Sequence, residues 1–362
     1  MKRSETALNR FRILEEEKES LYTALQKKVH AKQQPFVTAG DERDVIQRIK
    51  SETAICNVSN LTRTQSYLMF HSQYPEVHWA LLAHLVSRNG GYSMTDLKSS
   101  YIGPLLHQSE KNDLFQILEI INAAIFLDAY PQLLLYEESK KRNRNLFHLL
   151  PAFRVSAFME PIWSCFFQTG NSALLTRALI TNEQSMIEEN ILSGKSASIF
   201  SNLKFSFQEK WGLTNILFPY KKHHKQKQHS LAGITVTGFQ SLSERIRTGK
   251  KLYHILFHHR KIHESILAYC KSSAHTGSRS DYWPHLFSSS RDPFRLTSPY
   301  LADAWPIIPG PESIEKDWLL QLGIPEGFEL PETEKLQDLT NKVMADLLKL
   351  APISAISKKL FR

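Results

Sequence analysis

The chain has 362 residues, of which 42% are hydrophobic and 22% are charged. This is an ordinary globular composition, and the length suits one large domain or two of common size. The three scattered cysteines, Cys56, Cys165 and Cys270, lack Cys-x-x-Cys spacing, so the sequence indicates neither a disulfide framework nor a cysteine zinc site. We therefore expect a reducing compartment.

The positive charge of the chain is concentrated in one segment. The formal net charge is +9, and residues 221–272 account for all of it, because 11 lysines and arginines there are opposed only by Glu244 and Glu264. The rest of the chain is formally neutral. The basicity is therefore a property of this segment and not of the whole chain.

The N-terminus is charged throughout and lacks the apolar core of a signal peptide. No run reaches about 18 uninterrupted apolar residues, the length that a membrane-spanning helix needs. We therefore expect a cytoplasmic protein without membrane spans, either free or peripheral to a membrane surface.

Helical spacing dominates the first part of the chain. Apolar residues among charges predict helices over residues 9–31 and 41–55, and a third helix is expected to end at Pro75. A fourth, over residues 76–88, has a buried face. Asn89-Gly90-Gly91 is expected to stop it, because glycine tolerates the left-handed conformation that ends helices, and "SMTD" matches a capping box that opens a new helix.

The remainder is also predominantly helical in pattern. We expect a long helix over 111–142 with a kink at Pro131, a helix over 172–192, and a long helix or bent pair over 238–270. An amphipathic terminal helix follows Pro331. Only "GITVTG" alternates with the period of a strand, so a large sheet is disfavoured.

These patterns predict an all-α fold, a single multi-helix globular domain of about ten helices with irregular segments rich in proline, serine and aromatic residues. We expect a loosely attached, charged helical extension over residues 1–36 and the main helical domain over 37–325. Residues 326–362 would form the terminal amphipathic helix and tail, whose apolar stripe is a candidate contact for a protein partner.

Two blocks resemble a known family. The run from Asn57 to Leu97, which contains "HWALLAHLVSRNGGYSMTDL", and the later "HTGSRSDYWPHLF" resemble the YppC-like family of uncharacterised proteins from Bacillus-type bacteria. The resemblance covers roughly residues 40–310 and implies a bacterial cytoplasmic protein. Because the family is a domain of unknown function, it supplies no catalytic residues. The common phosphate-binding, dinucleotide-binding and hydrolase motifs are absent as well, so we expect no cofactor.

The first candidate site lies in the Asn57 to Leu97 block. If two helices fold back on each other at Pro75, Arg63 and Arg88 come close and form a forked anion site, with Asp96 as a balancing charge. The alternative is structural: Arg88 binds the free carbonyls of its own helix end, and Asp96 completes the capping box.

The second candidate is the basic segment. On a helical projection Arg247, Lys251, His254 and His258 share one face, with Lys250 beside them, and the opposite side is apolar. Such a helix suits an anionic membrane surface or nucleic-acid phosphates. The alternative is a solvated helix packed beside an acidic one such as "NEQSMIEEN".

Histidines four residues apart raise the question of a metal site in the same segment. His254 and His258 form one such pair, and His259 and His263 form another. No glutamate lies within a pair, and the surrounding positive charge opposes a divalent cation. We therefore expect no metal.

The third candidate is "HTGSRSDYWPHLF". Its small residues suit an anion-binding turn to which Arg279 adds charge, and His275 and Asp281 are weak candidates for an acid and base pair. The alternative is that these polar groups bond their own backbone while the aromatic residues anchor the segment to the core.

We therefore expect a non-enzymatic binding module that contacts a polyanionic surface, either membrane or nucleic acid, through residues 221–272. The alternative is an enzyme or sensor for a small phosphate- or carboxylate-bearing ligand, at a pocket formed by the blocks 57–97 and 275–287.

Overall fold

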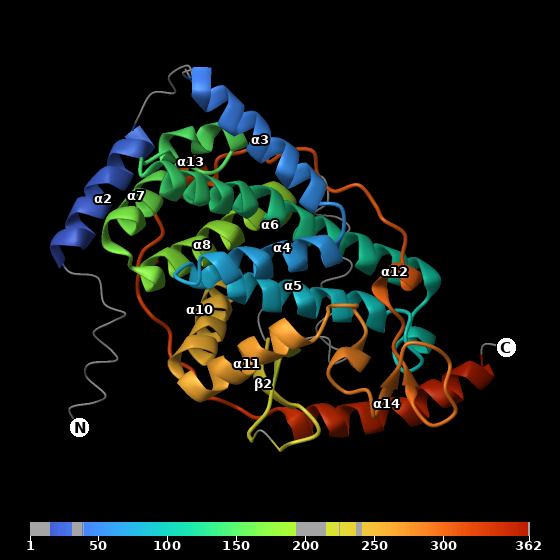
Figure 1. Cartoon of the computed structure of the whole chain (residues 1–362). Helices are drawn as coiled ribbons and strands as arrows, with labels where there is room; N and C mark the ends of the chain where they lie inside the picture. The colour runs from blue at the N-terminus through green and yellow to red at the C-terminus, as the bar shows by residue number, and fades with distance from the viewer. Residues whose placement is uncertain are drawn as a thin grey trace, which may run out of the picture.

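The computed structural model describes residues 15–30, 38, 40–192, 215–223, 225–236 and 241–360, with side chains up to 350. Figure 1 shows helices stacked around a long central helix, with a small hairpin and the last helix along one side. The helices are α2 (Glu15–His30), α3 (Gly40–Cys56), α4 (Asn60–Gln73), α5 (His78–Asp96), η1 (Gly103–Leu105), α6 (Gln108–Arg142), η2 (Phe147–Phe153), α7 (Met159–Thr169), α8 (Ser172–Ile187), η3 (Glu188–Leu192), α10 (Leu242–His258), α11 (Arg260–Ser272), η4 (Arg279–Asp281), α12 (Leu301–Ala304), α13 (Trp318–Leu322) and α14 (Thr340–Leu360).

The described strands form two small pairs. β1 (Asn215–Tyr220) and β2 (Ser230–Thr235) make an antiparallel hairpin with Leu217 opposite Gly233, and β3 (Phe287–Ser288) pairs in parallel with β4 (Leu296–Thr297). β2 overlaps the "GITVTG" stretch. The protein is thus a predominantly helical single globular domain, as the periodicity predicts.

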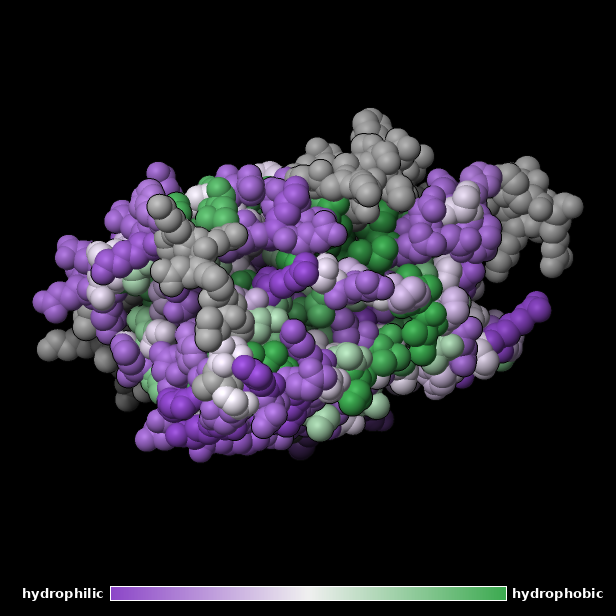
Figure 2. All heavy atoms as spheres, turned by 90° about the horizontal axis from the view of Figure 1, so that it is seen from above, coloured by the Kyte–Doolittle hydropathy of each residue, from purple (hydrophilic) through white to green (hydrophobic). Residues whose placement is uncertain are grey.

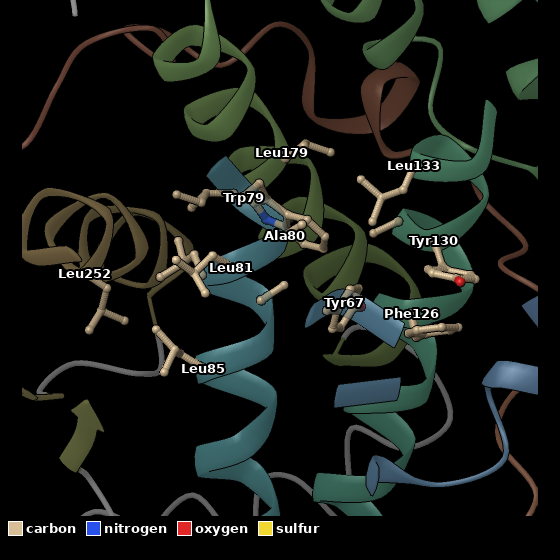
Figure 3. Packing of buried hydrophobic residues seen from close by; sticks show 14 of the residues in the cluster. Tyr67, Trp79, Ala80, Leu81, Leu85, Phe126, Tyr130, Leu133, Leu179 and Leu252 are labelled. Carbon is tan, nitrogen blue, oxygen red and sulfur yellow. The ribbon is translucent and has the colours of Figure 1, made fainter. Parts of the chain in front are cut away.

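The core lies where α4, α5, α6, α8 and α10 meet. Tyr67, Trp79, Phe126, Leu179 and Leu252 come from these five helices and belong to one buried hydrophobic cluster (Figure 3). All five side chains are buried. Burial of large apolar side chains drives association of the helices, at about 1.5 to 3 kcal/mol for each.

The central helix α6 runs without interruption through Pro131. By length and composition it could span a membrane, since an 18-residue window has a mean hydropathy of 1.4. However, 61% of that window is buried inside the protein, as is common for the core helix of a globular domain. This makes α6 weak evidence for a membrane span.

The corner predicted at Asn89-Gly90-Gly91 is wrong, because α5 continues through these residues to Asp96. The glycines serve tertiary contacts instead of ending a helix. A Cβ at Gly91 would lie 2.5 Å from Asn60 Oδ1 and 2.6 Å from His275 Nε2. The missing side chain is what allows α4 and the His275 segment to approach α5.

We expect Gly91→Ala to lower the free energy of unfolding by about 1 to 3 kcal/mol, because the added methyl overlaps two buried groups. Gly90→Ala is the matched control, since its Cβ would meet mainly the partly buried side chain of Asn122 at 3.0 Å. Urea unfolding of both variants checks this. Equal stability of the two variants would contradict the assigned role of Gly91.

The first and last helices in the described part of the chain pack on the domain. Leu21 and Leu25 of α2 are buried, and Lys28 pairs with Glu160 of α7 at 2.5 Å, so α2 is attached more firmly than we expected. In α14, Val343 is buried. Leu347 and Leu350 also pack against the core, so the stripe proposed for a protein partner is used within the chain.

Candidate functional site

The two blocks that carry the family resemblance meet inside the protein. α5 belongs to the first block, and the segment 273–282 that follows α11 contains most of the second block's polar residues. Their side chains, together with Tyr269 of α11, form a buried network, which we call the two-block cluster. Its members are Asn60, Arg88, Tyr92, Asp96, Tyr269, His275, Thr276, Arg279, Asp281 and Tyr282.

Arg88 fastens α5 to the end of α11. Its Nη1 donates to the carbonyl oxygen of Ser273 at 2.9 Å, and its Nη2 donates to that of Ala274 at 2.8 Å. Nε donates to the Tyr92 hydroxyl at 2.8 Å, and Nη2 lies 3.4 Å from Asp281 Oδ2. The arginine therefore binds carbonyls beyond the end of a neighbouring helix, and not those of its own helix.

Arg279 and Asp96 form a bidentate ion pair, in which Nε lies 2.8 and 2.9 Å from the two carboxylate oxygens and Nη2 lies 2.6 Å from Oδ2. The Tyr101 hydroxyl also donates to Asp96. The Asp96 side chain is 1% exposed and that of Arg279 is 12% exposed. The expected capping role of Asp96 is therefore wrong, because this carboxylate neutralises an arginine instead.

His275 and Asp281 lie close together but are enclosed. Asp281 accepts hydrogen bonds from Thr276 Oγ1 at 2.6 Å and from Tyr92 at 3.2 Å. His275 Nε2 lies 2.9 Å from Asn60 Oδ1, and its Nδ1 is 3.7 Å from Asp281 Oδ2, too long for a hydrogen bond. Burial lowers the pKa of His275 to about 4, so the imidazole is neutral near pH 7. Their side chains are 3% and 4% exposed, an arrangement that favours an internal brace over a working acid and base.

A small pocket lies beside the Arg279–Asp96 pair, and Tyr101, Asn215 of β1 and Asp346 of α14 help to line it. Its volume is about 40 Å³, which is room for a few water molecules. Pockets for drug-sized ligands are typically about 300 to 1,000 Å³. The pocket therefore suits solvent or a very small ion.

Arg63 has its own partners. Its Nη2 pairs with Glu119 of α6, and its Nη1 donates to the side-chain oxygen of Asn57 at 3.1 Å. Arg88 is bound to the segment 273–281. The two guanidiniums thus do not converge on one anion, contrary to the geometry that the folded-back helix pair suggested.

The predicted cationic face of α10 is largely covered by a returning segment of the chain. Lys250 is buried and donates to the Gly327 carbonyl oxygen at 3.0 Å, and burial lowers its pKa to about 8. Lys251 pairs with Glu334 at 3.0 Å, and His254 Nδ1 lies 3.1 Å from the backbone oxygen of the same glutamate. Lys250 is therefore not a surface residue, because residues 326–335 fold over this face.

The remaining cationic residues of the α10 face are only partly available to bind an anionic partner. Arg247 pairs with Glu244 at 2.7 Å and approaches Glu332 at 3.7 Å. His258 is exposed and stacks on His254 with ring centroids 4.3 Å apart. Across the described part of the chain, no group of three or more histidine, cysteine, aspartate or glutamate residues is placed to hold a metal ion.

A different set of lysines from the basic segment has no acidic partner in the described part of the chain. We call it the lysine surface: Lys221, Lys225 and Lys227 from the β1–β2 loop, and Lys261 and Lys271 from α11. The two elements are joined, since Ser265 Oγ accepts a hydrogen bond from the Lys221 amide at 2.7 Å. Lys221 is half-buried and the other four are exposed. No acidic side chain among the described residues lies within 4.0 Å of these lysines.

Sequence reasoning also missed a buried network of hydrogen-bonded side chains between α6 and α8. Asp128 accepts hydrogen bonds from Asn182 at 2.5 Å and Gln132 at 3.0 Å, and burial raises its pKa to about 7. Gln132 and Asn182 in turn accept bonds from the indoles of Trp163 and Trp318. The only signal in the sequence is a set of polar residues on otherwise apolar helices, which is too general to indicate this pairing.

Comparison with known proteins identifies the family to which this helical protein belongs. A family model described as "Protein of unknown function (DUF2515)" matches residues 56–342, which include both blocks of the two-block cluster and the lysine surface. The chain therefore belongs to this family.

A specific relative is the uncharacterised protein YppC of Bacillus subtilis (strain 168). It is 36% identical over 279 residues, which cover 76% of this chain and 83% of the relative. No solved structure matches the chain. The resemblance inferred from the two blocks is confirmed, and the match extends beyond residue 310 to the start of α14.

Proposed function

We propose that this protein is a non-enzymatic module that binds a polyanionic surface through the lysine surface. The observation that supports this most directly is the contrast in charge pairing within residues 221–272. Lys222, Arg245 and Lys251 are neutralised by Asp338, Glu188 and Glu334, whereas the five lysines of the lysine surface have no such partner among the described residues.

The geometry of the two-block cluster also favours a binding module over an enzyme or a sensor. The polar groups of the two-block cluster bond mainly to one another, and the pocket beside them holds only about 40 Å³. An enzyme or sensor for a small anionic ligand needs polar groups that are aimed at a ligand-sized space. His275, Asp281 and Arg279 instead stabilise the junction between α5, α11 and the segment 273–282.

Exposed lysines act on phosphates through long-range attraction and counterion release, which makes such binding sensitive to salt. The lysine surface combines a loop and a helix, each of which carries two exposed lysines. It therefore suits a phosphate-rich surface better than one small anion, which would need enclosing donors.

The test is binding of the full chain to vesicles of phosphatidylcholine and phosphatidylserine, and to duplex DNA, at about 50 and about 200 mM salt. We expect binding at the lower salt concentration that weakens by at least tenfold at the higher one. The triple variant Lys225→Gln, Lys227→Gln, Lys261→Gln should lose at least tenfold in affinity.

The matched control removes the same charge elsewhere, with Arg43→Gln, Lys50→Gln and Lys140→Gln on α3 and α6. It should bind as the unmodified chain does. Equal losses in the two triple variants would show that only net charge matters, and absence of binding to both vesicles and DNA would overturn the proposal.

A further inference from the structure

The loop between β3 and β4 presents an aromatic side chain to solvent. Phe294 is 95% exposed, the highest value for any large apolar residue in the described part of the chain. Single exposed apolar residues are common, so exposure alone says little. Phe294 differs from an ordinary exposed side chain because its loop is held in a fixed conformation.

The turn that carries Phe294 is ordered by its own hydrogen bonds. Asp292 Oδ1 accepts from the amides of Phe294 at 2.8 Å and Arg295 at 3.0 Å. The Arg295 guanidinium donates to Asp292 Oδ2 and, at 3.0 Å, to the Pro284 carbonyl oxygen. Pro293 further restricts the backbone. The phenyl ring is therefore held outward on a fixed turn, so little conformational entropy is lost when it binds.

A short series of contacts links this turn to the β1–β2 loop, which carries three lysines of the lysine surface. Trp283 Nε1 donates to the backbone oxygen of His229, at the end of the β1–β2 loop, at 2.8 Å. The next residue, Pro284, accepts the bond from Arg295. In Figure 1 the hairpin, α11 and the segment after it lie on the same side of the molecule. Figure 2 views the molecule from above, where hydrophilic residues predominate and hydrophobic residues form patches between them.

An exposed phenyl ring on a turn that is linked to a loop with several cations suits a peripheral membrane contact. The cations attract anionic headgroups, and the aromatic ring enters the interface between headgroups and acyl chains. A stacking platform for nucleic-acid bases requires several aromatic rings along a groove. Among the described residues, the only exposed large aromatic side chains are Phe294 and Tyr300.

We propose that the surface bound by this protein is an anionic membrane, and that Phe294 is its interfacial anchor. This rests on the proposed function, because the lysine surface supplies the attraction that brings the loop to the membrane. Arg291, which is exposed beside the turn, adds to that attraction.

The experiment measures vesicle binding and duplex DNA binding of Phe294→Ser in the full chain. Vesicles are made of phosphatidylcholine with phosphatidylserine, and of phosphatidylcholine alone. We expect a roughly tenfold loss of binding to the anionic vesicles, since the ring contributes apolar burial, and unchanged binding to DNA. Phe294→Trp should restore vesicle binding, and Ile55→Ser on α3 is the control for loss of an exposed apolar side chain.

The outcomes separate the two proposals. If Phe294→Ser binds anionic vesicles as tightly as the unmodified chain while the lysine triple variant does not, the anchor is wrong and the polyanion function stands. Equal losses toward vesicles and DNA would also reject the anchor. If the unmodified chain binds neither, both proposals fail.

Discussion

Replacing Arg279 with methionine is expected to destabilise the protein by about 3 to 5 kcal/mol. The substitution leaves Asp96, whose side chain is 1% exposed, as a buried carboxylate bonded to Tyr101 but without its cation. An uncompensated buried charge is costly because it has lost its hydration and gains no opposite charge. Urea unfolding followed by circular dichroism measures the loss.

Two further variants give this prediction its controls. The double variant Arg279→Met, Asp96→Leu should recover much of the stability, because no charge is left buried. Arg260→Met, which removes an arginine that is 90% exposed and paired with Glu264, should leave the free energy of unfolding nearly unchanged. A similar small effect for Arg279→Met would mean that Asp96 does not depend on its partner.

Acidification is expected to destabilise the protein well above the pH at which surface carboxylates titrate. Burial lowers the pKa of His71 and His275 to about 4 and that of His78 and His84 to about 3. Below about pH 6.5 these histidines are therefore protonated in the unfolded chain but not in the folded chain, so the free energy of unfolding decreases as the pH is lowered. Each such histidine contributes about 1.4 kcal/mol per pH unit in that range.

Two carboxyl groups act in the opposite direction. Burial raises the pKa of Asp128 and of Glu183 to about 7, so the folded chain holds these protons more tightly than the unfolded one. Four histidines against two carboxyls leave a net loss of about 2 to 3 kcal/mol per pH unit between about pH 6 and 5.

The measurement is the free energy of unfolding at pH 7, 6 and 5 for the unmodified chain and for His275→Gln. The variant should show a smaller dependence on pH, by the contribution of one group, since glutamine does not titrate. A free energy that stays level or rises as the pH falls would contradict the assignment of neutral, buried histidines.

Local sequence patterns predicted the helices because each helix buries one apolar side, and this periodicity is written in the sequence itself. Trp79 and Leu82 mark the buried side of α5 correctly. The error at Gly90 and Gly91 has a clear cause. A helix-ending signal and a site of close packing both require glycine, and only the positions of Asn60 and His275 decide between them.

The candidate site was predicted only as a set of residues. The polar character of Arg88, Arg279 and Asp96 is visible in the sequence, but the Arg279–Asp96 pair joins residues 183 positions apart. Similarly, the spacing of Arg247 and Lys251 places them on one helix face with Lys250 beside it, while nothing in that spacing shows that residues 326–335 cover it. Long-range pairing therefore decided which charges remained on the surface.

The most direct test of the account is hydrogen–deuterium exchange of the full chain with and without anionic vesicles at about 50 mM salt. The account predicts slower exchange in the β1–β2 loop at residues 221–229, along α11 and in the loop that carries Phe294, with little change in α5 or in residues 326–335. Protection confined to α5 and the segment 273–282, or no protection anywhere, would contradict binding through the lysine surface.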